Sequence, residues 1–325
     1  MLKLGVIGSN WITERFIKAT QESHSFWVHA IYSRELEKAR EFAAKYDAPY
    51  YFDSLEDLAN SDVDAVYIAS PNSLHAPQAI QMMEQGKHVI VEKPMASNYR
   101  LAKQMYAVAE RNKVVLFEAY MSAYLPNFTI VRQKMAQLGT LRKVFMQYCQ
   151  YSSRYQKFLD GDNPNTFNPN FSNGSIMDIG FYCIAACIDL FGEPQSIQAS
   201  ATLLTSGVDG HGSVILNYEG FDAVIMHSKV NDSYLPSEIQ GEDAALQIDM
   251  IALCQKVELY QGGQLPISIG VQQNDNPMYY EAQAFAQAIQ AGGISPEAKQ
   301  RALSTAKIIT QIRLQTGVVF PDDNE

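Results

Sequence analysis

The chain has 325 residues, and its 25 Lys and Arg against 35 Asp and Glu give a net charge of −10 at pH 7. Domains usually run about 100–200 residues, so this length predicts two domains, with a single α/β barrel as the alternative. A hydrophobic fraction of 47% is enough to build packed cores and excludes a disordered protein. The acidic balance argues against a nucleic-acid partner, because that affinity comes from clustered Lys and Arg.

Neither a membrane span nor a metal site is expected. The longest apolar stretches, such as 63–69 and 88–91, are far shorter than the roughly 20 residues that cross a bilayer. Residues 1–8 are followed by the polar pair Ser9-Asn10 and by no small-residue cleavage site. This indicates a buried strand rather than a signal peptide. The cysteines and histidines show no metal-ligand spacing. We therefore expect a cytoplasmic protein with buried thiols.

The first part of the chain alternates short apolar runs with amphipathic stretches. Strands are expected at 2–7, 28–32, 65–68, 88–91 and 114–117, and helices at 35–46, 76–84 and 99–111. Strands that are apolar on both faces and joined by helices form a parallel sheet with helices on both sides. With right-handed crossovers this α/β pattern gives a doubly wound Rossmann domain, which we assign to residues 1–118.

The pattern changes after a helical segment at 127–137. Further strands are expected at 142–152, 197–204, 213–218, 223–230, 238–240, 245–248 and 256–260. They predict an α+β domain, residues 119–325, with a large, mostly antiparallel open sheet. Helices expected at 176–191, 279–291 and 296–315 can cover only part of it. Because an uncovered sheet face is often buried against another chain, we expect a homodimer or homotetramer through this sheet.

One irregular segment, 160–174, lies between the first strand of this sheet and its long helix. It is rich in Asn, Pro and Gly, which is typical of loops. Both an ordinary surface loop and a lid over a cleft fit this composition.

The turn after the first strand, Gly8-Ser9-Asn10-Trp11-Ile12, has the position of a dinucleotide-binding loop. A glycine there lets a pyrophosphate approach the backbone at the N-terminus of the next helix. Gly8 matches the first glycine of that pattern, and Asn10 stands where the second is usual. Asn tolerates left-handed backbone conformations, so we expect the turn to form. Alone the motif is weak, because an ordinary strand-to-helix turn can also contain glycine.

The second strand ends in Tyr32-Ser33-Arg34, where an NAD site usually has Asp or Glu. A hydroxyl followed by a guanidinium suits a 2′-phosphate. We therefore expect NADP, with NAD possible; a surface arginine at a helix start is the alternative.

Polar residues also follow the strands at 65–68 and 88–91. They are Ser70, Pro71, Asn72 and His75 after the first strand, and Glu92, Lys93 and Pro94 after the second. All fall on the carboxyl edge of the sheet, where open α/β sheets bind ligands. His75 can cap the following helix near the phosphates. Lys93 lies where a nicotinamide would bind, although in isolation it could be a solvated lysine.

Asp178 and Tyr182 are four residues apart on the expected helix 176–191, so both can face one side of a cleft. Asp178 can accept a hydrogen bond from a substrate hydroxyl or hold Lys93, and Tyr182 can donate one to a substrate oxygen. A carboxylate bonded to backbone amides at the helix start and a half-buried core aromatic fit these two residues equally well.

Together these motifs resemble the Gfo/Idh/MocA oxidoreductase family over nearly the whole chain. The matching residues are Gly8, Ser70-Pro71-Asn72-Ser73-Leu74-His75, Glu92-Lys93-Pro94, the run 174–182, Tyr280-Glu281 and Phe285. Members of the family carry His or Tyr four residues after the Asp. With Tyr182 after Asp178, this chain is similar to the dihydrodiol dehydrogenase branch and related sugar or aldose branches. The resemblance implies a two-domain NAD(P)-dependent dehydrogenase or reductase whose cleft lies between the domains. Asn10, and a run 121–124 without the usual Trp-Arg, depart from the family pattern.

Oxidising an alcohol requires hydride transfer, which the cofactor performs, and removal of the hydroxyl proton by the protein. Lys93 is the candidate general acid/base, because burial and a nicotinamide cation both disfavour its ammonium form. We expect an oxidoreductase acting on a sugar, polyol or related hydroxy or keto compound, with Lys93, Asp178 and Tyr182 as catalytic residues. A redox-neutral hydrolase or lyase and a non-catalytic NADP-binding sensor are the alternatives.

Overall fold

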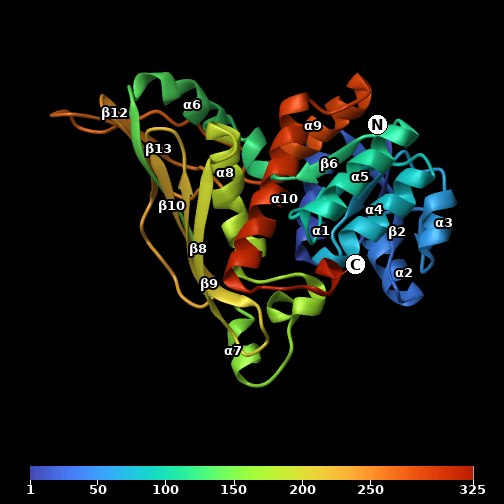
Figure 1. The fold of residues 1–325 in the computed structure, drawn as a ribbon. Helices are drawn as coiled ribbons and strands as arrows, with labels where there is room; N and C mark the ends of the chain where they lie inside the picture. Colours follow the sequence, from blue (N-terminus) through green and yellow to red (C-terminus); the bar gives the residue numbers. More distant parts are fainter. Residues whose placement is uncertain (325) are drawn as a thin grey trace. The chain divides into compact units, whose positions relative to one another are not determined.

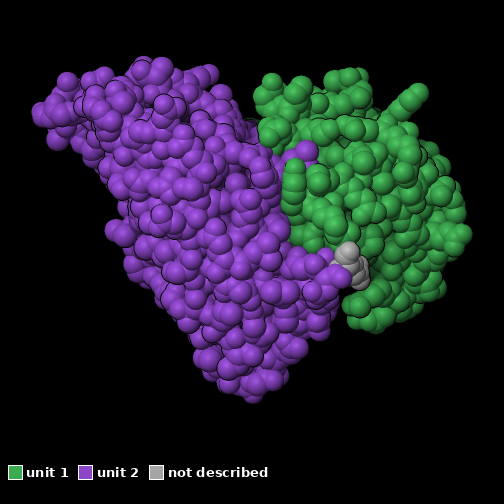
Figure 2. All heavy atoms as spheres, in the orientation of Figure 1, with its two compact units in different colours: residues 1–121, 274–300 green, residues 122–273, 301–325 purple. Residues whose placement is uncertain are grey.

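The computed structural model describes residues 1–324, which cluster into two compact units (Figure 2). Unit 1 comprises Met1–Met121 and Asn274–Gln300. Unit 2 comprises Ser122–Gln273 and the chain from Arg301 onward. Each unit is built on one β-sheet (Figure 1).

Unit 1 contains a six-stranded parallel sheet in the order β3-β2-β1-β4-β5-β6. Its strands are β1 (Leu2–Ile7), β2 (Phe26–Tyr32), β3 (Tyr50–Phe52), β4 (Ala65–Ile68), β5 (His88–Glu92) and β6 (Leu116–Ala119). Its helices are α1 (Trp11–Glu22), α2 (Leu36–Lys45), α3 (Leu55–Asn60), α4 (His75–Glu84), α5 (Tyr99–Asn112) and α9 (Met278–Ala291). The strand order reverses between β1 and β4, which is where such sheets bind ligands at their carboxyl ends. The predicted Rossmann sheet is confirmed.

The two edge strands of this sheet differ most from the expectation. The short edge strand β3 was not predicted, because two of its three residues are exposed and it lacks an apolar run. Strand β6 begins at Leu116 rather than at residue 114. Both differences lie at or near sheet edges, where pairing depends on a neighbouring strand rather than on the pattern of the segment itself.

Helix α9 completes the core of unit 1, although it comes more than 150 residues after the other elements. The Phe285 ring stacks on Phe26 at 5.3 Å and lies 5.5 Å from the Phe117 ring, centroid to centroid. The Asn276 side chain donates to the backbone oxygen of Arg15 at 2.8 Å. Aromatic packing on the sheet therefore anchors a segment remote in sequence.

Unit 2 contains an eight-stranded sheet in the order β14-β13-β12-β11-β7-β10-β9-β8. The strands are β7 (Leu141–Cys149), β8 (Ser196–Leu203), β9 (Asp209–Asn217), β10 (Asp222–Ser228), β11 (Ser237–Gly241), β12 (Ala244–Ile248), β13 (Val257–Gln261) and β14 (Ile267–Ser268). Among the described strands of this sheet, only the neighbours β7 and β10 pair in parallel. The predicted open, mostly antiparallel sheet is confirmed.

The helices of unit 2 are α6 (Pro126–Lys134), α7 (Tyr155–Leu159) and α8 (Phe181–Phe191), together with most of α10 (Pro296–Thr316). Helix α8 packs against β7 and β10 (Figure 1). The segment Pro169–Phe191 is long and apolar enough to cross a bilayer, which the sequence analysis did not recognise. However, 72% of that stretch is buried inside the protein, as expected for a core helix.

The expected single helix 176–191 is wrong in its first turn. Residues Ile176–Gly180 form a π-helical turn, and the α-helix begins at Phe181. A Cβ on Gly180 would lie 2.8 Å from the end of the Ile176 side chain and 3.1 Å from the His227 ring, so a larger residue would have to displace these side chains. π-Turns of this kind often occur at functional sites.

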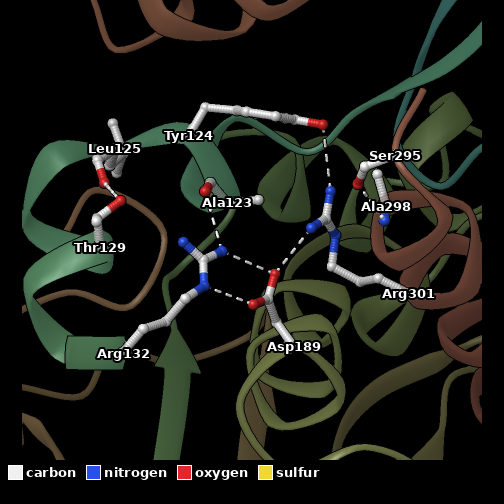
Figure 3. Close-up of polar contacts among 9 residues, drawn as sticks. All are labelled: Ala123, Tyr124, Leu125, Thr129, Arg132, Asp189, Ser295, Ala298 and Arg301. Carbon is white, nitrogen blue, oxygen red and sulfur yellow. Dashed lines mark hydrogen bonds and ion pairs between the residues drawn. The ribbon is translucent and has the colours of Figure 1, made fainter. Parts of the chain in front are cut away.

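A buried carboxylate joins α6, α8 and α10 (Figure 3). Asp189, 7% exposed, accepts hydrogen bonds from Arg132 Nε at 2.7 Å and from Arg301 Nη1 at 2.9 Å. Arg301 also donates to the hydroxyl of Tyr124 at 3.2 Å. Charged groups are tolerated in such a position only when paired and hydrogen-bonded, so this cluster fixes how the three helices pack.

Candidate active site

The turn after β1 requires glycine at position 8. Gly8 has φ +114°, and a Cβ added to it would lie 2.9 Å from the backbone oxygen of Ala69. Both the left-handed region and the lack of space exclude other residues. The turn therefore leaves the backbone open at the N-terminus of α1, as the dinucleotide pattern predicts.

Asn10 stabilises this turn in a way that differs from the expectation. Its backbone is extended, with φ −96° and ψ 178°, so no left-handed conformation is needed. Its Oδ1 accepts the N–H groups of Ile12 at 3.0 Å and Thr13 at 3.1 Å, while its Nδ2 donates to the Ala69 oxygen at 3.1 Å. Asn10 is thus the N-cap of α1 and also ties the turn to the end of β4.

The first exposed residues of α1 flank this turn. Trp11 is 63% exposed, and the guanidinium of Arg15 lies 6.0 Å from the centre of its ring. Ser9 is also exposed, and Ile12 is half-buried. These side chains border the surface that a bound nucleotide would occupy at the N-terminus of α1.

Ser33 and Arg34 directly follow β2. The N–H of Ser33 donates to the Phe52 oxygen at 3.1 Å, which fixes the backbone beside β3. Arg34 is exposed, and within residues 1–324 its guanidinium has no ion-pair partner. The cations that follow it on α2, Lys38 and Arg40, instead pair with glutamates of their own helix. Arg34 is therefore available for an anion at this edge of the sheet.

His75 connects the segments that follow β4 and β5. Its Nδ1 lies 2.9 Å from the Pro94 oxygen and its Nε2 lies 2.8 Å from the Ser70 oxygen. Burial lowers the pKa of His75, although the two carbonyl contacts oppose this shift. Its side chain makes no capping bond to α4, contrary to the expectation, because both ring nitrogens face these carbonyls.

Lys93 follows β5, half-buried and next to the cis peptide Lys93–Pro94. The carboxylates on either side are held by hydrogen bonds: Glu92 accepts the Tyr67 hydroxyl at 2.6 Å, and Glu118 accepts the N–H of Met95 at 2.9 Å. The nearby 3₁₀ turn Asn72–Leu74 carries Asn72, and Pro71 precedes it. Gly8, Asn10, Ser70, His75 and Lys93 thus all lie on one edge of the unit 1 sheet.

Asp178 and Tyr182 belong to unit 2, whereas Lys93 belongs to unit 1. Asp178 lies in the π-turn and Tyr182 in the first turn of α8, where its ring centre is 5.7 Å from that of Tyr148 on β7. Sequence reasoning missed the partner of Asp178, the ammonium of Lys229, which donates to Asp178 Oδ2. Lys229 falls inside the strand expected at 223–230, and nothing in the sequence indicates its contact with Asp178.

Buried polar side chains of β9 and β10 contact the π-turn and the residue before it. Asp209 Oδ2 accepts the N–H of Ile176 at 2.7 Å, and His227 Nδ1 lies 2.9 Å from the hydroxyl of Ser175. Burial raises the pKa of Asp209 to about 6 and lowers the pKa of His227 to about 3. His227 is therefore neutral near pH 7, and Asp209 changes charge in the mildly acidic range.

Comparison with known proteins identifies the family. Residues 2–120 match the model described as "Oxidoreductase family, NAD-binding Rossmann fold", and residues 131–247 match the "GFO/IDH/MocA C-terminal domain". The chain belongs to the Gfo/Idh/MocA oxidoreductase family. The resemblance found in the sequence motifs is confirmed, and a Gfo/Idh/MocA protein is an NAD(P)-dependent oxidoreductase.

Individual relatives cover the whole chain. It is 50% identical to the uncharacterized oxidoreductase YgjR of Escherichia coli K12, over 100% of this chain and 99% of the relative. It is 46% identical to the scyllo-inositol 2-dehydrogenase (NADP(+)) IolU of Bacillus subtilis 168, over 99% of both chains. A crystal structure of KijD10, a 3-ketoreductase from Actinomadura kijaniata, with NADP and TDP-benzene, has the same fold at 22% identity, with a TM-score of 0.85 over 98% of this chain and 99% of that one.

Replacement of Asp209 by Asn should change the pH dependence of stability. Because burial raises the pKa of Asp209 from 3.8 to about 6, its contribution to stability is fully present below the unfolded value and is lost as the pH rises through about 6. Asp209→Asn removes this ionisation. From about pH 4 to pH 7.5, the unfolding free energy of the variant should therefore rise relative to wild type by about 3 kcal/mol.

Urea unfolding followed by far-UV circular dichroism measures this difference. Tryptophan fluorescence would miss it, because Trp11 and Trp27 both lie in unit 1. A difference between the two proteins that does not change with pH would contradict the assignment of a raised pKa to Asp209.

Proposed function

We propose that this Gfo/Idh/MocA protein is an NADP-preferring dehydrogenase of a cyclic polyol or sugar. The observation that carries the proposal is its 46% identity, over 99% of both chains, to a protein named scyllo-inositol 2-dehydrogenase (NADP(+)). The similarity at 28% identity to trans-1,2-dihydrobenzene-1,2-diol dehydrogenase of Mus musculus also concerns oxidation of a ring-bound hydroxyl. Vicinal ring hydroxyls are thus the common substrate feature.

The turn after β1 fits the cofactor. Gly8 leaves room beside Ala69 for a close backbone approach, and the positive end of the α1 dipole attracts an anion while Asn10 caps the amides of Ile12 and Thr13. Arg34 adds a cation where a 2′-phosphate would lie, so NADP is preferred and NAD can bind more weakly. When bound, NADP supplies the hydride acceptor. We assign cofactor binding to residues 1–118, through Ser9, Trp11, Ile12, Ser33, Pro71, Asn72 and Glu92 in addition to the residues discussed above.

The protein's own residues handle the hydroxyl proton. Lys93 takes the proton from the substrate hydroxyl as the carbonyl forms. Tyr182 donates a hydrogen bond to the reacting oxygen, and Asp178 accepts one from a neighbouring hydroxyl and so orients the ring. We assign these substrate contacts, except for Lys93, to the predicted domain 119–325 without its segment Asn274–Gln300, which belongs to unit 1.

We propose a cytoplasmic location. All four cysteines are buried free thiols, and Cys183 and Cys187 remain unbridged although they lie one helical turn apart. Proteins in reducing compartments keep such thiols without disulfides.

Lys93→Met should lower kcat by about 100- to 1,000-fold, because general acid–base groups typically contribute this much. The NADP dissociation constant should change little. The assay follows NADPH absorbance with scyllo-inositol, other cyclic polyols, sugars and a dihydrodiol. The control is Lys87→Met, at the opposite end of β5, whose ammonium donates to the Ser61 oxygen.

The same assay separates the alternatives. Near-normal turnover in Lys93→Met would remove this lysine from the mechanism. A protein that copurifies with nucleotide and converts substrate without net NADPH formation would be a hydrolase or lyase. Tight NADP binding without any turnover of the panel would identify a sensor.

Arg34→Gln should weaken NADP binding by about 10- to 100-fold, because a charge-assisted hydrogen bond to phosphate contributes about 1.5–3 kcal/mol. NAD binding should stay the same, and Arg40→Gln on α2, the helix that follows Arg34, is the control. Isothermal titration of both nucleotides measures the effect. If wild type binds NAD at least as tightly as NADP, the role given to Arg34 is wrong.

The unit 2 sheet supports self-association. In Figure 1 helix α8 lies on one side of this sheet. Every second residue of β8 from Ser196 to Ser200 is exposed, and the apolar side chains of Leu203 and Ile267 on the edge strands are 41% and 48% exposed. A face of this kind commonly contacts its equivalent in a second copy around a two-fold axis. Light scattering should give two or four times 36.3 kDa. A monomer mass independent of concentration would contradict the oligomer.

A further inference from the structure

Lys229 is a buried cation that neither the motifs nor the family pattern drew attention to. It directly follows β10, and its side chain is only 8% exposed. Its N–H donates to the Gly210 oxygen, and its carbonyl accepts the N–H of Ser152, both at 2.9 Å. The backbone of this lysine is therefore fixed on both sides, and its ammonium has a defined position.

The ammonium of Lys229 contacts Asp178 Oδ2. The two members of this pair differ in exposure, since the Asp178 side chain is 32% exposed against 8% for Lys229. Burying an ammonium is costly, and a buried ion pair stabilises a fold no better than apolar side chains of similar size. A buried cation beside a partly exposed carboxylate is better explained if the carboxylate must keep one orientation.

The same strand also fixes the backbone beneath Asp178. His227 lies in β10, and Lys229 lies in the bend that directly follows this strand. His227 contacts Ser175 at the start of the turn, and Lys229 contacts Asp178 in its middle. Residues at the C-terminal end of β10 thus hold both the start of the turn and its carboxylate.

We propose that Lys229 is a positioning residue for the dehydrogenase reaction. It holds the Asp178 carboxylate in one orientation, so that this carboxylate accepts a hydrogen bond from a hydroxyl of the polyol or sugar. Lys229 itself touches neither substrate nor cofactor. This inference rests on the proposed function, because it assigns Asp178 to substrate binding.

The test compares Lys229→Met, Lys229→Arg, Asp178→Asn and the double variant Lys229→Met/Asp178→Asn. The probe reaction is NADP reduction with scyllo-inositol or with the best substrate of the panel. Lys229→Met should lower kcat/KM by about 10- to 100-fold, and Lys229→Arg, which keeps the charge, should retain most of the activity. The NADP dissociation constant should stay the same in all variants.

The double variant distinguishes positioning from a general structural effect. If Lys229 acts through Asp178, Lys229→Met should cause little further loss once Asp178→Asn is present. A purely structural effect would multiply the two losses and would not depend on the residue at position 178. Thermal unfolding identifies any variant that fails to fold, and Lys229→Arg then carries the comparison.

Lys143→Met is the matched control. Lys143 pairs with both carboxylate oxygens of Asp222 at 2.8 Å, at the opposite end of β10, with 46% of its side chain exposed. The substitution Lys143→Met removes the same charge from the same sheet and should leave kcat/KM unchanged. Wild-type turnover with an equally active Lys229→Met would overturn this inference alone. A wild-type protein that turns over nothing in the panel would overturn the proposed function together with it.

Discussion

The carbonyl oxygen of Ala69, one residue beyond β4, is the point on which the ligand-binding edge of unit 1 depends. It excludes any side chain at position 8 and accepts the amide of Asn10. The next carbonyl, that of Ser70, faces the His75 ring, which also faces the carbonyl of Pro94. These contacts join the ends of β1, β4 and β5 through the side chains of Asn10 and His75, which bind backbone oxygens and so fix the geometry of the edge.

Unit 2 organises its catalytic candidates by a different principle. Its π-turn rests on buried titratable groups, and burial shifts the pKa of Asp209 upward and that of His227 downward. Groups of this kind are costly to bury and are retained where geometry matters more than stability. The turn that carries Asp178 is therefore fixed by polar contacts that a purely apolar core could replace, but without the same orientation of the carboxylate.

Sequence patterns predicted the elements well and their contacts poorly. The period of apolar residues located β1 and β4 to the residue, because burial on both faces produces continuous apolar runs. Periodicity reports burial and not hydrogen bonds across the fold, so it could not distinguish a π-turn from an α-turn over Ile176–Gly180. For the same reason it gave no sign of the contact between Lys229 and Asp178 or of the capping bonds of Asn10.

The capping side chain of Asn10 has a consequence for how cofactor preference can change. In this turn the side chain of the protein itself occupies the amides of Ile12 and Thr13, so the loop keeps its shape whether or not a nucleotide is present. Little ordering of this loop accompanies binding, which lowers the entropic cost of association. The recognition of the pyrophosphate is thereby uncoupled from that of the ribose at Ser33 and Arg34. A change of preference between NADP and NAD then requires substitutions only at the end of β2. The turn around Gly8 can bind either nucleotide.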